Sequence, residues 1–195
     1  MSDAKTPAWA NPAPAGLTAY AIACFTFYAV LTGRVPHSTV PMLGCWLLGG
    51  FIVQIVVALI ELREGALLGG NVFLVFSGFF MLTGGLEFLL KGFGINATSE
   101  IDGWAWLVLL LTLVLWTPAY LKTSPRVMGI LVLVLDVGVL FVTLRDLGAV
   151  SGATGSPIAG YALAISGILA IYLAAAMQLN AAFGKTLLPL GKPIL

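Results

Sequence analysis

The residues that could do chemistry in this sequence are polar side chains set inside long apolar runs. Asp136 stands near the middle of the apolar run 127–144. A charged group at the centre of a bilayer costs at least about 2.5 to 3.5 kcal/mol, so such residues usually face the interior of a helix bundle and mark a pathway. The alternative is a protonated or hydrogen-bonded packing residue. On the first interpretation the chemistry is noncovalent, because a protonated Asp136 can donate a hydrogen bond to a passing solute.

Uncharged polar residues gather in two neighbouring apolar runs. The hydrogen-bonding side chains there are those of Gln54, Asn71, Ser77 and Thr83. They could replace part of the water around a permeating anion, or they could simply bond across helices. As a cluster beside many glycines, they indicate a narrow, partly polar passage. Glu61 ends the first of these runs, either within a charge cluster at the membrane face or as a source of electrostatics at a pore mouth.

Hydrolytic and redox chemistry find little support in the sequence. It holds one histidine, His37, and no nucleophile motif, Walker loop or dinucleotide fingerprint. Cys24 and Cys45 lie in apolar runs without CxxC or Cys/His spacing, which indicates small core residues and neither a disulfide nor a metal site. We therefore expect no enzyme activity, no cofactor and no metal. The net charge of +1 gives no basic patch, which excludes nucleic acid as a partner.

The composition shows what surrounds these residues. Of the 195 residues, 60% are apolar and 9% are charged, and the mean hydropathy is +1.06. Ordinary globular chains carry about 25% charged residues, and runs of about 20 apolar residues are typical of membrane spans. The sequence therefore predicts an all-α polytopic membrane protein. Six runs are long enough to cross a bilayer as helices, at residues 17–32, 42–62, 66–90, 104–121, 127–144 and 158–179.

Short connections leave no room for a soluble domain. We predict a cytoplasmic N-terminal segment at 1–14, a six-helix transmembrane domain at 15–182 and a cytoplasmic tail at 183–195. Cytoplasmic loops carry an excess of Lys and Arg. The end of the bundle that holds both termini carries Lys5, Arg63, Lys122, Arg126, Lys185 and Lys192, and the other end carries Arg34, Lys91 and Arg145. This excess predicts cytoplasmic termini in an inner or plasma membrane.

Small residues and turn residues indicate where helices meet and where a solute could bind. The second and third runs are rich in glycine, which allows close helix packing and favours a symmetric oligomer. Before the first run stands Asn11-Pro12-Ala13-Pro14-Ala15-Gly16-Leu17. Its prolines and glycine constrain the chain at the start of a helix, where free backbone N–H groups make a site for a carboxylate. Asn11 and Pro12 are therefore candidate site residues.

This stretch closely resembles the opening signature of the acetate uptake transporter family, also called succinate–acetate permeases or the YaaH family, whose pattern is Asn-Pro-Ala-Pro-x-Gly-Leu. The resemblance continues with Gln54, Glu61 and Gly65 around the end of the second run. It recurs at Ala170-Ile171-Tyr172-Leu173 and at Phe183-Gly184-Lys185-Thr186-Leu187-Leu188-Pro189-Leu190-Gly191. Together these motifs span nearly all of residues 11–191.

The resemblance implies six helices per protomer, a homo-hexamer, and in each protomer an hourglass passage for acetate and, in some members, succinate. In that family a Phe, a Tyr and a Leu from three helices form the constriction. By position they resemble Tyr20, Phe76 and Leu135 of this sequence, so both aromatic residues are changed and the hydroxyl has moved to another helix. Asp136 also departs from the usual uncharged residue.

These observations predict transport of small monocarboxylates, chiefly acetate, by a channel or a proton-coupled permease within the lipid bilayer. The candidate pathway residues are Asn11, Pro12, Tyr20, Gln54, Glu61, Asn71, Phe76, Leu135 and Asp136. Two other classes stay open: a carboxylate-sensing membrane protein without transport, and a channel for a neutral solute such as water or ammonia. The changed aromatic positions leave the preference between acetate and succinate open.

Overall fold

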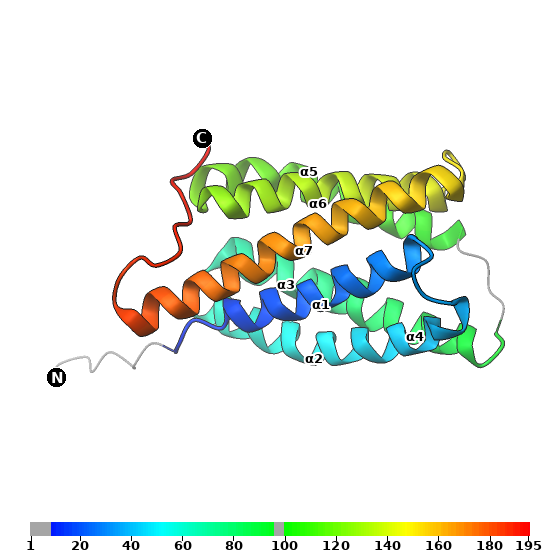
Figure 1. Cartoon of the computed structure of the whole chain (residues 1–195), viewed down its shortest axis with the longest axis horizontal. Coiled ribbons are helices and arrows are strands. Elements are labelled where there is room, and N and C mark those ends of the chain that lie inside the picture. Colours follow the sequence, from blue (N-terminus) through cyan, green and yellow to red (C-terminus); the bar gives the residue numbers. More distant parts are fainter. Residues whose placement is uncertain (1–8, 96–99) are drawn as a thin grey trace.

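Six long helical spans lie side by side in the computed structural model, which describes residues 9–95 and 100–195 (Figure 1). Each span is long and apolar enough to cross a membrane. Within those two ranges the chain contains no strand. The prediction of an all-α protein with six membrane spans is confirmed.

The spans begin and end close to the bounds expected from hydropathy. They are α1 (Ala13–Leu31), α2 (Val40–Arg63), a third span made of α3 (Leu67–Phe76), η2 (Ser77–Leu82) and α4 (Thr83–Gly92), then α5 (Glu100–Thr123), α6 (Arg126–Asp146) and α7 (Gly152–Phe183). A short 3-10 helix, η1 (His37–Thr39), leads into α2. α1 begins and α7 ends at the same end of the bundle, here called the terminal end (Figure 1). The opposite end is the loop end.

The third span differs from the single helix predicted over 66–90. Its middle, η2, is a π-helix, and there the hydroxyl of Thr83 donates to the carbonyl of Gly78, five residues back, at 3.1 Å. Hydropathy shows how long an apolar run is, but it does not show the spacing of the backbone hydrogen bonds. The π-helix was therefore not predicted. Such wide turns are frequent at functional sites.

Some of the helix bounds and the tail also differ from the prediction. α7 begins at Gly152 and not at residue 158, so that Pro157 lies inside the helix near its start, where it removes one backbone bond. α1 begins at Ala13, inside the predicted N-terminal segment 1–14; residues 1–8 of that segment, with Lys5, lie outside the described ranges. The predicted tail after residue 182 docks on the bundle, because the N–H of Ile194 donates to the carbonyl of Leu121 at 2.9 Å.

The spans are arranged as a ring. Going around it, the third span packs on α2, α2 on α1, α1 on α7, α7 on α6 and α6 on α5. The ring closes loosely between α5 and the third span, because the backbones of these two spans come close to each other at few positions. Side chains bridge this seam, since the ring centroids of Phe80 in the third span and Trp106 on α5 lie 5.5 Å apart. Phe80 also packs on Phe27 of α1, with ring centroids 5.3 Å apart.

α2 and α4 approach each other closely at Gly44 and Gly85. A Cβ on Gly44 would stand 2.6 Å from the carbonyl oxygen of Gly85, and one on Gly85 would stand 3.1 Å from the carbonyl oxygen of Gly44. Because the obstacle is backbone, it cannot turn aside as a flexible side chain would. Glycine at both positions lets the two helices pack at this distance.

Gly44→Ala should therefore destabilise the folded protein by about 1–3 kcal/mol, as overpacking a filled core does. Gly138→Ala on α6 is the matched control, because a Cβ there would meet its neighbours at an ordinary 3.5 Å. The measurement is the midpoint of thermal unfolding in detergent. Equal midpoints for the two variants would contradict the close crossing of α2 and α4.

Candidate functional site

A cavity of about 180 Å³ lies in the middle of the ring, and all six spans contribute to its wall. We call it the central cavity. Its aromatic lining consists of Tyr20, Phe27, Phe73, Phe76, Phe79, Phe80, Phe88 and Trp106. The amide of Gln54 adds a polar group to this wall. The cavity has room for a small organic solute in mostly apolar surroundings.

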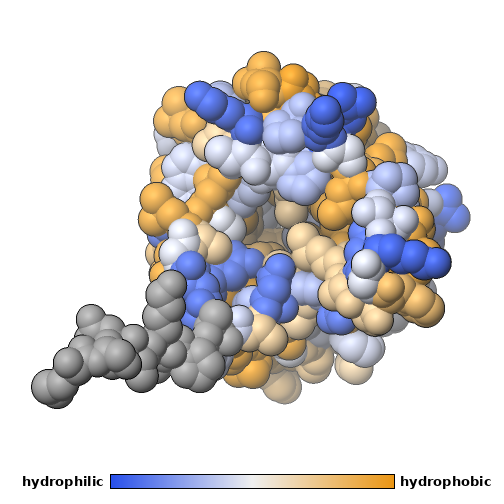
Figure 2. Space-filling view, turned by 90° about the vertical axis from the view of Figure 1, so that its left-hand side faces the viewer, coloured by the Kyte–Doolittle hydropathy of each residue, from blue (hydrophilic) through white to orange (hydrophobic). Residues whose placement is uncertain are grey.

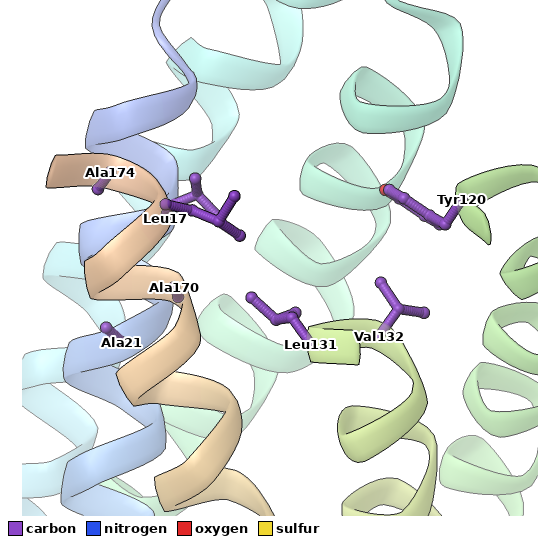
Figure 3. Close-up of a cluster of buried hydrophobic side chains, with 8 residues drawn as sticks. Leu17, Ala21, Tyr120, Leu131, Val132, Ala170 and Ala174 are labelled. Carbon is purple, nitrogen blue, oxygen red and sulfur yellow. The ribbon is translucent and has the colours of Figure 1, made fainter. Parts of the chain in front are cut away.

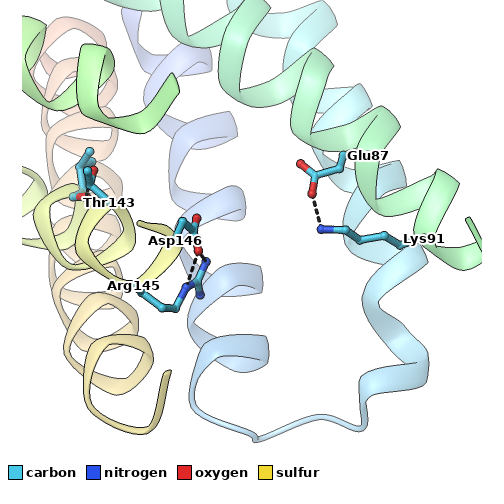
Figure 4. Close-up of polar contacts among 6 residues, drawn as sticks. Glu87, Lys91, Thr143, Arg145 and Asp146 are labelled. Atoms are coloured by element: carbon cyan, nitrogen blue, oxygen red, sulfur yellow. Dashed lines mark hydrogen bonds and ion pairs between the residues drawn. The ribbon is translucent and has the colours of Figure 1, made fainter. Parts of the chain in front are cut away.

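Charged side chains line the central cavity toward the loop end. On α4, Lys91 forms an ion pair with Glu87 one helical turn away, and on α6 the guanidinium of Arg145 donates to the carboxylate of Asp146 at 2.7 Å (Figure 4). Asp102 of α5 lines the same region. This mouth is thus polar and carries charges of both signs.

A second hollow, of about 560 Å³, opens at the terminal end, and we call it the terminal vestibule. In Figure 2, which faces that end of the molecule, the surface is hollowed near its centre and hydrophilic residues lie around the hollow. Its walls come from residues 9–13, the end of α2, the start of α3, and parts of α5, α6 and α7. Among the described residues, none lines both the vestibule and the central cavity.

A cluster of buried apolar side chains, which we call the apolar plug, packs against residues that line each of the two hollows (Figure 3). It consists of Leu17, Ala21, Tyr120, Leu131, Val132, Ala170, Leu173 and Ala174. Tyr20 and Phe73 pack on it from the central cavity, while Leu68 and Met177 pack on it from the vestibule. The interior of the bundle therefore resembles an hourglass: the central cavity reaches toward the loop end, the vestibule opens at the terminal end, and the apolar plug lies between them.

The three residues predicted to form the constriction come together at the central cavity. Tyr20, Phe76 and Leu135 all line it, and both aromatic rings pack against the buried cluster that contains Leu135. The hydroxyl of Tyr20 is bonded to Ser166 at 2.6 Å, so the ring turns its polar atom toward α7. That this trio selects the solute stays a prediction.

Two more predicted residues line a hollow and carry an unpaired buried atom. Gln54 lines the central cavity, is 2% exposed, and its amide oxygen has no hydrogen-bond partner in the described structure. Glu61 lines the vestibule, and one of its carboxylate oxygens likewise lacks such a partner there. That oxygen rests against Gly69, where any Cβ would collide with it.

The start of α1 differs from the prediction of free backbone N–H groups. The N–H of Ala13 donates to Oδ1 of Asn11 at 2.9 Å, and the N–H of Ala15 donates to the carbonyl of Pro12 at 3.0 Å. Pro14 has no N–H to offer. These bonds remove the expected carboxylate site, and Asn11 and Pro12 remain as residues that line the vestibule.

Asn71 and Asp136 line neither the central cavity nor the vestibule in the described part of the chain, so their place on the pathway stays a prediction. The amide of Asn71 donates to the carbonyl of Leu67 on its own helix at 2.8 Å. Asp136 lies between α5 and α6 and accepts a 2.7 Å bond from the hydroxyl of Thr117. Successive helical residues point about 100° apart, so the neighbour of Leu135 faces elsewhere.

Sequence reasoning missed the apolar plug. Leu131 precedes Leu135 by four residues and Leu17 precedes Tyr20 by three, which places each plug residue one helical turn nearer the terminal end on the same face. This spacing is the signal that could have located the plug. Ser166 gave no comparable signal, because a serine in an apolar helix is usually a packing residue.

Comparisons with known proteins cover nearly the whole chain. The sequence matches the GPR1/FUN34/yaaH family over residues 1–184. The fold is similar to a solved structure described as that of the bacterial acetate channel SatP, with a TM-score of 0.84 and 25% sequence identity, over 94% of this chain and 99% of that chain. No curated protein sequence matches significantly.

The pair of Thr117 and Asp136 yields a test of the buried polar contacts. Thr117→Val should leave the Asp136 carboxyl without its hydroxyl donor and lower the stability by about 1–3 kcal/mol, whereas Thr117→Val with Asp136→Leu should recover most of the loss. Thr143→Val is the matched control, because the buried hydroxyl of Thr143 donates only within its own helix, to Val139. The measurement is thermal unfolding in detergent. A double variant no more stable than Thr117→Val alone would contradict the pairing.

Proposed function

The chain belongs to the GPR1/FUN34/yaaH family, and we propose that it transports acetate across the membrane through the central cavity. The observation that carries this proposal is the hourglass interior of a six-span bundle, with a hollow at each end and an apolar plug between them. The similar structure is that of an acetate channel, and the likeness extends over the whole bundle. The chain is a transport protein and not an enzyme.

The lining of the route suits a small monocarboxylate. A carboxylate that leaves water loses strong hydrogen bonds, and an apolar wall does not replace them. In the central cavity the amide of Gln54 can replace one of these bonds, and the edges of aromatic rings carry partial positive charge that favours an anion. The methyl group of acetate forms no hydrogen bonds with water, so it gives up none when it packs against the same rings. A solute with one charged group and a short apolar end therefore fits this cavity best.

Uptake of labelled acetate into proteoliposomes, with and without a pH gradient, tests the proposal. Protein-free vesicles correct for acetic acid that crosses the lipid itself. We expect uptake well above these vesicles, and the effect of the gradient separates a channel from a proton-coupled permease. A sensor would bind acetate without uptake, and a channel for a neutral solute would pass water or ammonia but not acetate. Either result overturns the proposal.

We infer that both termini face the cytoplasm. In support, α1 begins and α7 ends at one end of the bundle, and the end residues Arg63, Lys122 and Arg126 of their neighbouring spans lie there too. Cytoplasmic flanks are enriched in such residues. The division into a cytoplasmic segment at 1–14, a transmembrane domain at 15–182 and a cytoplasmic tail at 183–195 follows from this orientation.

The constriction yields a prediction about selectivity. Replacing both Tyr20 and Phe76 by alanine should raise succinate flux relative to acetate by about tenfold, because the rings offer no bonds to the second carboxylate of succinate. Phe25→Ala is the control, since Phe25 lies on α1 but is exposed and does not line the central cavity in the described structure. The assay compares the two fluxes in proteoliposomes. An unchanged ratio in a folded double variant would remove these residues from the filter.

We also infer a homo-oligomer, most simply a closed ring of six. Gly49 on α2 and Gly78 in η2 have no atoms within 4 Å of where a Cβ would stand, so these small residues leave room that the protomer does not use. Such surfaces allow helices of neighbouring subunits to approach closely. Mass measurement of the detergent-solubilised protein should give six copies. A monomer that still transports acetate would contradict this inference.

A further inference from the structure

Ser166 is a buried polar residue that contacts Tyr20, one of the three residues of the predicted constriction. It lies on α7, is 0% exposed, and its hydroxyl oxygen stands 2.6 Å from the hydroxyl oxygen of Tyr20 on α1. In the described structure Ser166 itself lines neither the central cavity nor the vestibule. Any effect of Ser166 on a passing solute must therefore act through the residues that it contacts, of which Tyr20 lines the central cavity.

The direction of the hydrogen bonds follows from a second contact. The hydroxyl of Ser166 donates to the backbone carbonyl of Leu131 on α6 at 3.3 Å. A serine hydroxyl has one hydrogen, so with that hydrogen on Leu131 it accepts the hydrogen of Tyr20. The bonds run from α1 to α7 to α6 and tie three spans together beside the plug. The thiol of Cys24, one turn along α1, is a second polar group near the Tyr20 hydroxyl.

The ring of Tyr20 lies between the apolar plug and the central cavity. It packs on the apolar plug and also on the neighbouring buried cluster that contains Leu135. It also lines the central cavity. With its hydroxyl bonded to α7, the ring lies against the wall and presents only carbon atoms along its face. Without that bond, a buried hydroxyl would lack its acceptor and the ring would turn toward other partners.

We propose that Ser166 is a positioning residue that sets the width of the passage by holding the ring of Tyr20 against α7. The proposal rests on the proposed function, because it assigns a selectivity role within the same route. An untethered ring samples more orientations, and the waist then admits longer carboxylates. Ser166 thereby favours acetate over acids with a longer apolar chain.

The experiment compares acetate and butyrate fluxes in the same proteoliposomes, so that differences in protein content cancel. The variants are Ser166→Ala, Tyr20→Phe and the double variant. Each single variant should lower the acetate-to-butyrate ratio by about fivefold, which corresponds to the loss of one net hydrogen bond. The double variant should lower it no further, because both changes break the same tether.

Three outcomes would overturn the proposal. Tyr20→Phe keeps the ring and loses only the hydroxyl, so a wild-type ratio in this variant overturns it even where Ser166→Ala fails to fold. A Ser166→Ala effect that is as large in the Tyr20→Phe background shows a role in helix packing alone. The third is an equal shift in Thr143→Val, which removes a buried hydroxyl that bonds only within α6. A wild-type protein that carries neither acid refutes instead the proposed function.

Discussion

Lipid offers no hydrogen bonds, so the polar groups of the spanning segments must find partners within the chain. Most side-chain hydroxyls in the spans meet this demand locally, as the hydroxyls of Thr18, Thr32 and Thr143 do by donating to carbonyls four residues back. In the described structure, three buried side-chain oxygens have no partner, on Gln54, Glu61 and Asp136. Gln54 and Glu61 each line a hollow. Two of the three buried oxygens without a hydrogen-bond partner therefore lie along the proposed route.

The charges that line the two hollows and the apolar residues between them have different effects on a solute anion. At the mouth, Lys91 and Arg145 are each paired with an acid on their own helix, which reduces the field that an arriving anion meets. The terminal vestibule is lined by Glu61 and Glu64 and, among its described lining residues, by no lysine or arginine. Neither hollow therefore concentrates anions strongly. On the proposed route, discrimination then comes from the apolar lining of the central cavity and of the waist, where the loss of hydration grows with the number of charged groups on the solute.

The sequence predicted the membrane spans well, because the membrane thickness imposes a length that summed hydropathy detects. The family resemblance predicted that Tyr20, Phe76 and Leu135 form a constriction. In the structure all three line the central cavity, and their role as a constriction stays a prediction. The sequence did not predict that Asp136 faces α5, because a polar residue within a span does not indicate which neighbouring helix its side chain faces. The bonds at Asn11 were missed for a related reason: a proline-rich helix start predicts free N–H groups, but a preceding side chain can cap them.

The looseness of the ring between α5 and the third span explains why aromatic residues dominate the central cavity. Where helix backbones stand apart, only large side chains can close the wall, and Phe80 does so by packing on Trp106 of α5, while it also contacts Phe27 of α1. Phe80 lies in the π-helix, whose wider turn changes the direction of the residues that follow it. Phe76 ends α3 and Phe80 lies inside η2, so the same stretch of backbone positions a residue of the predicted constriction and the residue that closes the seam. On the proposed route, selectivity and the integrity of the wall are therefore coupled through one segment of the third span.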